Sequence, residues 1–163
     1  MAGKRGQIKM SFGMIFSIIL IVIFLAVAFY AVQKFLELQN TALISKFAND
    51  LQSDIDKIWK GNQGNQPQEY VLPKKIKFVC FIDYSSSSNS QIYDDLRRNF
   101  YDVENLFFHP LGSSPGFESK EIKHIDLNAT TSSENPLCFD NKDGKIELIL
   151  TKDFGEALVT ITR

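Results

Sequence analysis

The sequence predicts an α+β protein in which a long N-terminal transmembrane and stalk helix precedes a small, mainly antiparallel β-sheet head with one short helix. Three observations indicate this class. Residues 10–32 carry no charge, apolar residues then recur at helical spacing as far as Lys60, and beyond Pro73 apolar and polar residues alternate as they do in strands. The predicted parts are a cytoplasmic leader (1–9), a transmembrane helix (10–32), an amphipathic stalk helix (33–60), a linker (61–73) and an extracytoplasmic head (74–163).

The uncharged stretch 10–32 reads MSFGMIFSIILIVIFLAVAFYAV. As a helix it spans about 34 Å, slightly more than the hydrocarbon core of a bilayer, which is about 30 Å thick. A helix is required in lipid because no water is present to satisfy the backbone polar groups. The alternative is a buried core helix, but core helices rarely stay apolar on every side over this length. We therefore expect membrane lipid around this segment.

The charges around the span predict its orientation. Lys4, Arg5 and Lys9 precede it and no acidic residue does. A positive flank favours a cytoplasmic N-terminus, which makes this a single-pass protein of the cell membrane with its C-terminal head outside the cytoplasm. Apart from those three, 15 basic residues stand against 19 acidic ones. A mildly acidic head argues against nucleic acid as a partner.

The N-terminus allows three interpretations: an uncleaved signal anchor, a secretory signal peptide cut after Ala26-Val27-Ala28, or a prepilin-like leader. The third follows from a resemblance. Lys4-Arg5-Gly6-Gln7, followed closely by a long apolar helix, resembles the class III-like leader of archaeal type IV pilin-like proteins. In that family a dedicated peptidase cuts after a small residue such as Gly, and Gln often begins the mature chain. The resemblance covers about the first 35 residues and implies cleavage between Gly6 and Gln7.

The stalk carries an apolar stripe. Its members recur at steps of three and four, which places them on one face of a helix: Ile44, Phe47, Leu51, Ile55 and Ile58. The simplest structure is one helix from about residue 10 to residue 60. The stripe can pack on the protein's own head or on a second copy in a coiled coil. The pilin-like resemblance implies a homo-oligomer or partner subunits that contact the N-terminal helix.

The head is predicted to be a small sheet. Residues 61–67 (GNQGNQP) end the stalk helix and begin a flexible linker. Residues 75–83 form a strand that is apolar on both faces and therefore central in the sheet. A capping box at Ser88 and Gln91 opens the short helix. The remaining strands are expected at residues 106–108, 122–127, 138 onward to a turn at Asp143-Gly144, 146–151 and 157–162.

The two cysteines are candidates for a disulfide. Cys80 and Cys138 lie in the predicted extracytoplasmic part, where disulfides persist. The alternative is a pair of buried free thiols. Asn128-Ala129-Thr130 matches the N-glycosylation acceptor pattern, which is usable only if the head lies outside.

The sequence gives no catalytic constellation. His109 and His124 have no second His or Cys at metal-ligand spacing. The segment 140–144 (DNKDG) is similar to the start of a calcium loop, but Lys142 stands where an acceptor is needed, so a turn is the better interpretation. Cys80, in the middle of an apolar strand, is expected to be unreactive. We therefore predict no enzyme activity, no metal site and no cofactor.

Together these features predict a single-pass, membrane-anchored, extracytoplasmic structural or interaction protein. The specific version is a type IV pilin-like filament or pseudopilin subunit. The alternative is a monomeric, signal-anchored envelope domain for adhesion or complex assembly. An anchored enzyme is a third possibility.

Overall fold

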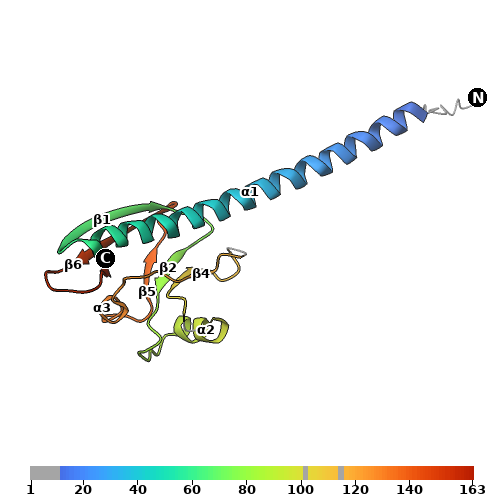
Figure 1. The fold of residues 1–163 in the computed structure, drawn as a ribbon. Coiled ribbons are helices and arrows are strands. Elements are labelled where there is room, and N and C mark those ends of the chain that lie inside the picture. Colours follow the sequence, from blue (N-terminus) through green and yellow to red (C-terminus); the bar gives the residue numbers. More distant parts are fainter. Residues whose placement is uncertain (1–11, 101–102, 114–115) are drawn as a thin grey trace, which may run out of the picture. The chain divides into compact units, whose positions relative to one another are not determined.

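The computed structural model describes residues 12–100, 103–113 and 116–163 of the chain. The chain divides into two compact units, residues 1–38 and 39–163. Helix α1 (Phe12–Lys60) contributes to both units (Figure 1). The expected continuous helix is therefore confirmed over the described residues. Met10 and Ser11, the start of the predicted span, lie outside them.

In the first unit, the described residues are all helical and exposed. Exposed apolar side chains face every direction around this part of the helix, from Phe12 (85% exposed) to Leu38 (69% exposed). The helix is long and apolar enough to cross a membrane. Its exposed apolar surface matches the requirement of a lipid environment, since a soluble helix of this length would bury one face.

The second unit contains two antiparallel sheets (Figure 1). The predicted α+β layout is therefore confirmed. The first sheet has the order β1-β6-β7, with β1 (Gly64–Val71), β6 (Lys145–Lys152) and β7 (Thr160–Thr162). The second has the order β4-β3-β2-β5, with β4 (Ser119–Lys120), β3 (Leu106–His109), β2 (Phe78–Phe81) and β5 (Leu137–Asp140). The described residues of this unit also form two short helices, α2 (Gln91–Asn99) and α3 (Leu127–Thr130).

The main core lies between the last turns of α1 and the two sheets. The five residues of the stripe, Ile44, Phe47, Leu51, Ile55 and Ile58, are at most 5% exposed. The ring of Phe47 meets Tyr70 of β1 and Phe108 of β3 edge to face, with centroids 5.3 and 5.8 Å apart. The stripe therefore packs on the protein's own head, and these side chains are not available for a coiled coil.

A second, smaller core covers the other face of the β2–β3 pair. It joins Ile82 and Phe107 to Tyr93 and Leu96 of α2. Strand β2 thus lies inside its sheet and is covered on both faces, as its apolar pattern predicted.

Three predictions about local structure are wrong. Residues 61–73 are not a flexible linker, because they include the eight-residue strand β1, which pairs with β6 along its full length. Residues 122–127 form no strand, because His124 has a positive φ of 65° and only Ile125 makes an isolated bridge, to Val159. The N-cap of α2 is Ser90, and the Ser88 hydroxyl accepts the Ser90 N–H instead.

The predicted turn at Asp143-Gly144 and the predicted terminal hairpin are confirmed. Asp143 and Gly144 form the turn between β5 and β6, and both have positive φ, 56° and 94°. This is the conformation for which a two-residue turn selects Asp-Gly. β6 and β7 pair antiparallel at the end of the chain.

Candidate binding groove

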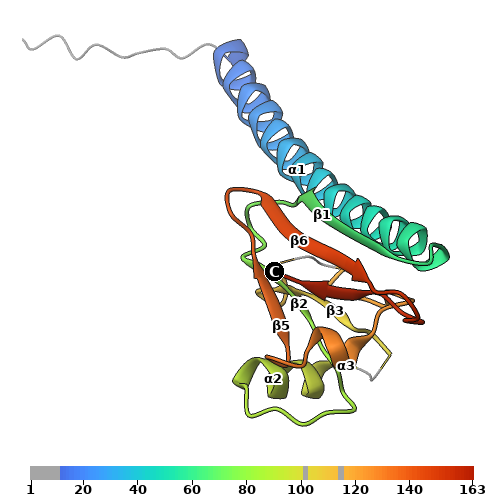
Figure 2. The ribbon, with the colours of Figure 1, turned by 90° about the vertical axis from the view of Figure 1, so that its left-hand side faces the viewer.

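Strands β5 and β6 leave the Asp143-Gly144 turn in different sheets. Lys142 and Lys145 still pair with each other next to the turn, with N···O distances of 2.9 and 3.1 Å. Beyond them β5 pairs with β2 and β6 pairs with β1. Figure 2 shows the two strands joined at one end and diverging, with the C-terminal end of the chain between them.

The space between these strands is a groove of about 1170 Å³. Its volume exceeds that of ordinary small-ligand pockets, which hold roughly 300–1,000 Å³. Its lining combines apolar side chains with charged side chains of both signs. The lining consists of Pro67, Gln68, Glu69, Phe78, Ile92, Glu134, Cys138, Phe139, Asp140, Lys142, Lys145, Glu147, Leu148, Ile149 and Arg163.

Two ion pairs order the rim of the groove. Lys145 Nζ lies 2.8 Å from Glu69 Oε1, and this carboxylate raises the pKa of Lys145. Arg163 Nη2 lies 2.9 Å from Glu134 Oε2 and also donates to the carbonyl oxygen of Cys138 at 3.0 Å. Each of these four side chains is about half exposed, so the pairs orient the rim more than they stabilise the fold.

The predicted disulfide forms one wall of the groove. Cys80 of β2 and Cys138 of β5 stand directly opposite each other and are bonded, with their Cα atoms 4.0 Å apart. Cys80 is buried, whereas Cys138 is partly exposed and lines the groove. The disulfide therefore joins two adjacent strands and ties the outer strand β5 to the core of its sheet.

Both histidines have structural partners. The His124 ring stacks on Trp59, with centroids 3.7 Å apart, and its Nδ1 lies 2.8 Å from Asp56 Oδ1. This hydrogen bond lowers the pKa of Asp56. His109 stacks on Phe78 with centroids 4.1 Å apart, and partial burial lowers its pKa. His124 and Trp59 thus fasten the segment before α3 to the end of α1.

A second hollow, of about 480 Å³, has three carboxylates in its lining, from Asp83, Glu104 and Glu121. Asp83 already accepts hydrogen bonds from the backbone N–H and the hydroxyl of Ser85, at 2.8 and 2.7 Å. Over residues 12–100, 103–113 and 116–163, no group of three or more His, Cys, Asp or Glu side chains could hold a metal ion.

The two other predicted sites are the glycosylation site at Asn128 and the leader-cleavage site. Asn128 is exposed on α3, but Thr130 of the same acceptor pattern is buried, and its hydroxyl accepts the Ile161 N–H at 3.0 Å. Any glycan on Asn128 would therefore have to be added before β7 docks. The predicted cleavage site, Gly6 and Gln7, lies outside the described residues.

The groove itself was not predicted from the sequence. Most of its residues come from β1, β5 and β6, with others from β2, α2, a loop and the end of the chain, and they meet where two neighbouring strands join different sheets. The one local signal was the Asp-Gly turn from which the strands diverge. No protein-family model, no curated protein and no solved structure matches this chain.

Proposed function

We propose that the protein is a single-pass membrane protein whose extracytoplasmic head binds another protein. One observation carries this proposal: residues 12–32 form an exposed helical segment without a charged side chain, while residues 39–163 form a separate compact unit with its own core. The positive flank before the span and the Cys80–Cys138 disulfide support an extracytoplasmic head. The groove between β5 and β6 is the binding surface we assign to the head.

The specific version of the proposal is a pilin-like or pseudopilin subunit. It is supported by the leader-like Lys4-Arg5-Gly6-Gln7 before the apolar helix. The stripe from Ile44 to Ile58 is occupied by the head, so assembly of subunits would use the exposed apolar surface of residues 12–38. A monomeric anchored domain for adhesion or complex assembly is the second candidate. The groove favours it, because a single head can bind a partner there without assembling into a filament.

The orientation is tested by protease treatment of intact cells followed by mass spectrometry of the protected fragments. Digestion of the head with retention of the first residues supports the proposal. A head protected in intact cells and digested only after lysis would contradict it.

The two versions are separated by sequencing the N-terminus of protein purified from its native membrane. A mature chain that starts at Gln7 supports the pilin-like subunit. A chain that retains Lys4 and Arg5 supports the signal-anchored domain. Electron micrographs of cells with and without the gene then test the filament, which must disappear on deletion if this chain is its main subunit.

A further inference from the structure

We propose that a patch of lysines at one end of the head binds the anionic headgroups of the membrane that anchors the protein. The patch consists of Lys74, Lys75, Lys77, Lys142 and Lys145. This inference rests on the proposed function, because it requires that residues 12–32 cross a membrane. It goes further by naming a second surface of the head and the chemistry of what that surface binds.

The charges of the second unit are unevenly distributed. Residues 71–77 and 141–145 hold five lysines and one acidic residue, Asp143. The rest of residues 39–163 holds nine basic and 17 acidic residues. A head with an excess of acidic residues therefore carries one strongly basic region. Such a separation of charge creates a local field of one sign, which attracts a surface of the opposite sign.

Backbone and side-chain hydrogen bonds bring the two lysine-bearing segments together. The Leu72 N–H donates to the Gly144 carbonyl at 2.9 Å, and the Asn141 N–H donates to the Lys77 carbonyl at 2.8 Å. The Asn141 side chain also donates to two carbonyl oxygens of residues 73–76, at 3.0 and 2.7 Å. Two segments that are distant in the sequence thus form one surface.

The lysines of the patch are exposed, and most of their charge is not compensated within the protein. Lys145 pairs with Glu69 at 2.8 Å. Lys74 lies 3.6 Å from Asp143. Over the residues that the structure describes, the other three form no ion pair: Lys75, Lys77 and Lys142. Val71, which is 57% exposed, adds an apolar side chain beside them.

The lysine patch lies at the end of the second unit where α1 enters it. Strand β1 runs back along α1, because Gly64 lies against Ile58 and the Tyr70 ring meets Phe47 edge to face (Figure 1). Residues 71–77 follow directly after β1. They are therefore on the side of the first buried turn of α1 and not on the side where this helix ends.

The chain keeps this end of the head close to the membrane. Ile44, the first buried residue of α1, lies 12 residues after Val32, the end of the predicted span. Twelve residues cover about 18 Å as a helix and no more than about 43 Å when fully extended. The lysines therefore meet lipid headgroups at a high local concentration, whatever the angle between the two units. Nucleic acid and a second copy of the head are also anionic, but the chain does not hold them beside the patch.

The test uses the full chain in lipid nanodiscs, made either of equal parts of phosphatidylglycerol and phosphatidylcholine or of phosphatidylcholine alone. Mass spectrometry measures the rate at which a water-soluble amine reagent modifies each lysine. We expect Lys75, Lys77 and Lys142 to react about fivefold more slowly in the anionic discs. High salt should remove this protection, because it screens exposed charges. Lys60 and Lys123, which are exposed lysines outside the patch, should react equally in both lipids.

Two double variants form a matched pair. Lys75→Gln with Lys77→Gln removes two charges of the patch without breaking an ion pair or changing the groove lining. In anionic discs this variant should return the reaction rate of Lys142 to within about twofold of its rate in neutral lipid. Lys60→Gln with Lys123→Gln removes the same charge elsewhere and should leave Lys142 protected. All four positions are exposed, so both variants should fold.

Equal reaction rates of the patch lysines in both lipids would overturn the inference. Equal loss of protection in the two double variants would also overturn it, because the net charge of the head would then be the cause. Protection by added DNA in neutral discs, with none from anionic lipid, would assign the patch to nucleic acid instead.

Amide hydrogen exchange of residues 12–32 in the same discs tests the anchor separately. Slow exchange in both lipids, together with unprotected lysines, would refute the lipid contact and leave the membrane span intact. Fast exchange of these residues would refute the proposed function itself.

Discussion

The disulfide between Cys80 and Cys138 is the residue-level feature that we expect to stabilise the head most. The disulfide bridges a sequence separation of 58 and joins β5, the last strand in the order β4-β3-β2-β5, to the inner strand β2. A crosslink over such a loop restricts the unfolded chain far more than the folded one.

The first prediction concerns this bond. Replacing both cysteines (Cys80→Ala with Cys138→Ala) should lower the free energy of unfolding of the head by about 4 kcal/mol, as the chain-entropy model gives for a loop of this size. Urea unfolding with and without reductant measures it. Reductant should destabilise the natural chain by a similar amount and leave the double variant unchanged. A double variant as stable as the natural chain would show that the bond does not form in the cell.

Trp59, His124 and Asp56 make a second set of contacts, a ring stack and a hydrogen bond. The segment around His124 has little regular structure, and its backbone is held in the left-handed region. Its attachment to α1 depends on the Trp59 stack, the Asp56 hydrogen bond and a bond from the Lys123 N–H to Gln52 Oε1 at 2.8 Å. These contacts, together with the isolated bridge between Ile125 and Val159, hold a segment that forms no strand of its own.

The second prediction is a pH dependence. The hydrogen bond to His124 holds the pKa of Asp56 below its ordinary value of 3.8. A depressed carboxylate pKa gives stability that is present above the unfolded pKa and is lost as the pH falls through the folded one. Because Asp56 is about one-third exposed, the effect is limited to a few degrees of melting temperature. Asp56→Asn should therefore flatten the fall in melting temperature below about pH 4, whereas Asp153→Asn, in an exposed loop, should not. Equal acid sensitivity of the natural chain and Asp56→Asn would contradict the assignment.

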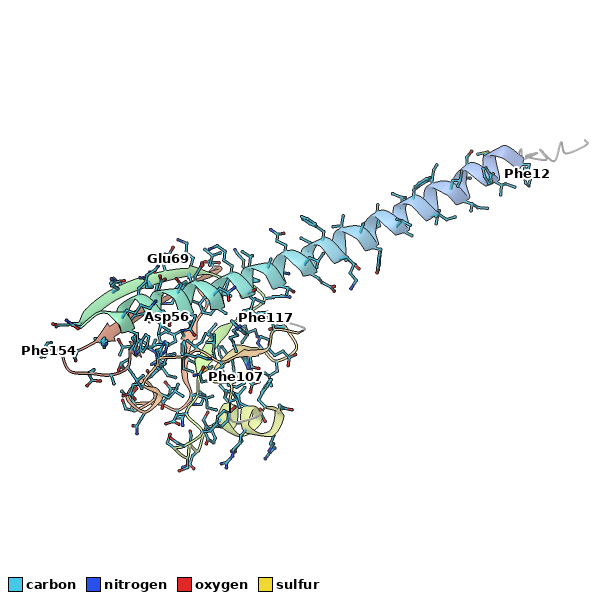
Figure 3. The ribbon with its side chains drawn as sticks, viewed as in Figure 1. Phe12, Asp56, Glu69, Phe107, Phe117 and Phe154 are labelled. Carbon is cyan, nitrogen blue, oxygen red and sulfur yellow. A yellow bond between two sulfur atoms is a disulfide. The ribbon has the colours of Figure 1, made fainter. Side chains whose placement is uncertain are left out.

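At the scale of elements, α1 changes its environment along its length. Leu38 is 69% exposed and Leu51 is fully buried, although both are leucines of one helix. The difference arises from what surrounds each turn, since Leu51 belongs to the core with β1, β3 and β6. Figure 3 shows Phe12 at the start of this helix and Asp56 near its end.

The third prediction uses this matched pair. Leu51→Ala should cost the head about 2–5 kcal/mol, because it removes a fully buried side chain and leaves a cavity. Leu38→Ala changes the same residue type on the same helix and should leave the unfolding of the head unchanged within about 0.5 kcal/mol. Denaturant unfolding in detergent, followed by tryptophan fluorescence of Trp59, compares the two. A similar loss in both variants would mean that Leu38 belongs to the core.

The elements also show where prediction from sequence succeeds. The helix, the strand around Cys80 and the terminal hairpin bury large apolar residues at a regular period, and all three were predicted. Strand β1 was missed because Gly64, Pro67 and its glutamines carry no such pattern, and only Tyr70 of this strand is buried. It is a strand because β6 offers a free edge. Phe154, a large apolar side chain in the loop between β6 and β7 (Figure 3), is 82% exposed and takes no part in the core.

At the scale of the whole molecule, the two units differ in the surroundings that they require. Residues 12–38 bury nothing within the protein, so their apolar surface needs lipid or another protein. Residues 39–163 hold both cores, the disulfide and the groove. The groove could not be predicted from the sequence, because it depends on the divergence of β5 and β6 into separate sheets, which no local pattern specifies.

The last prediction follows from this division. A chain that begins at Gln39 should fold alone and stay soluble without detergent, because the core residues from Ile44 to Ile161 all belong to the second unit. Its melting temperature should lie within about five degrees of that of the full chain in detergent, and its mass should show the disulfide. Adding Leu51→Ala should unfold it at a clearly lower temperature, which confirms that the measured transition is that of the core. A chain from Gln39 that is unfolded or aggregated while the full chain is folded would mean that residues 12–38 are required for the head to fold.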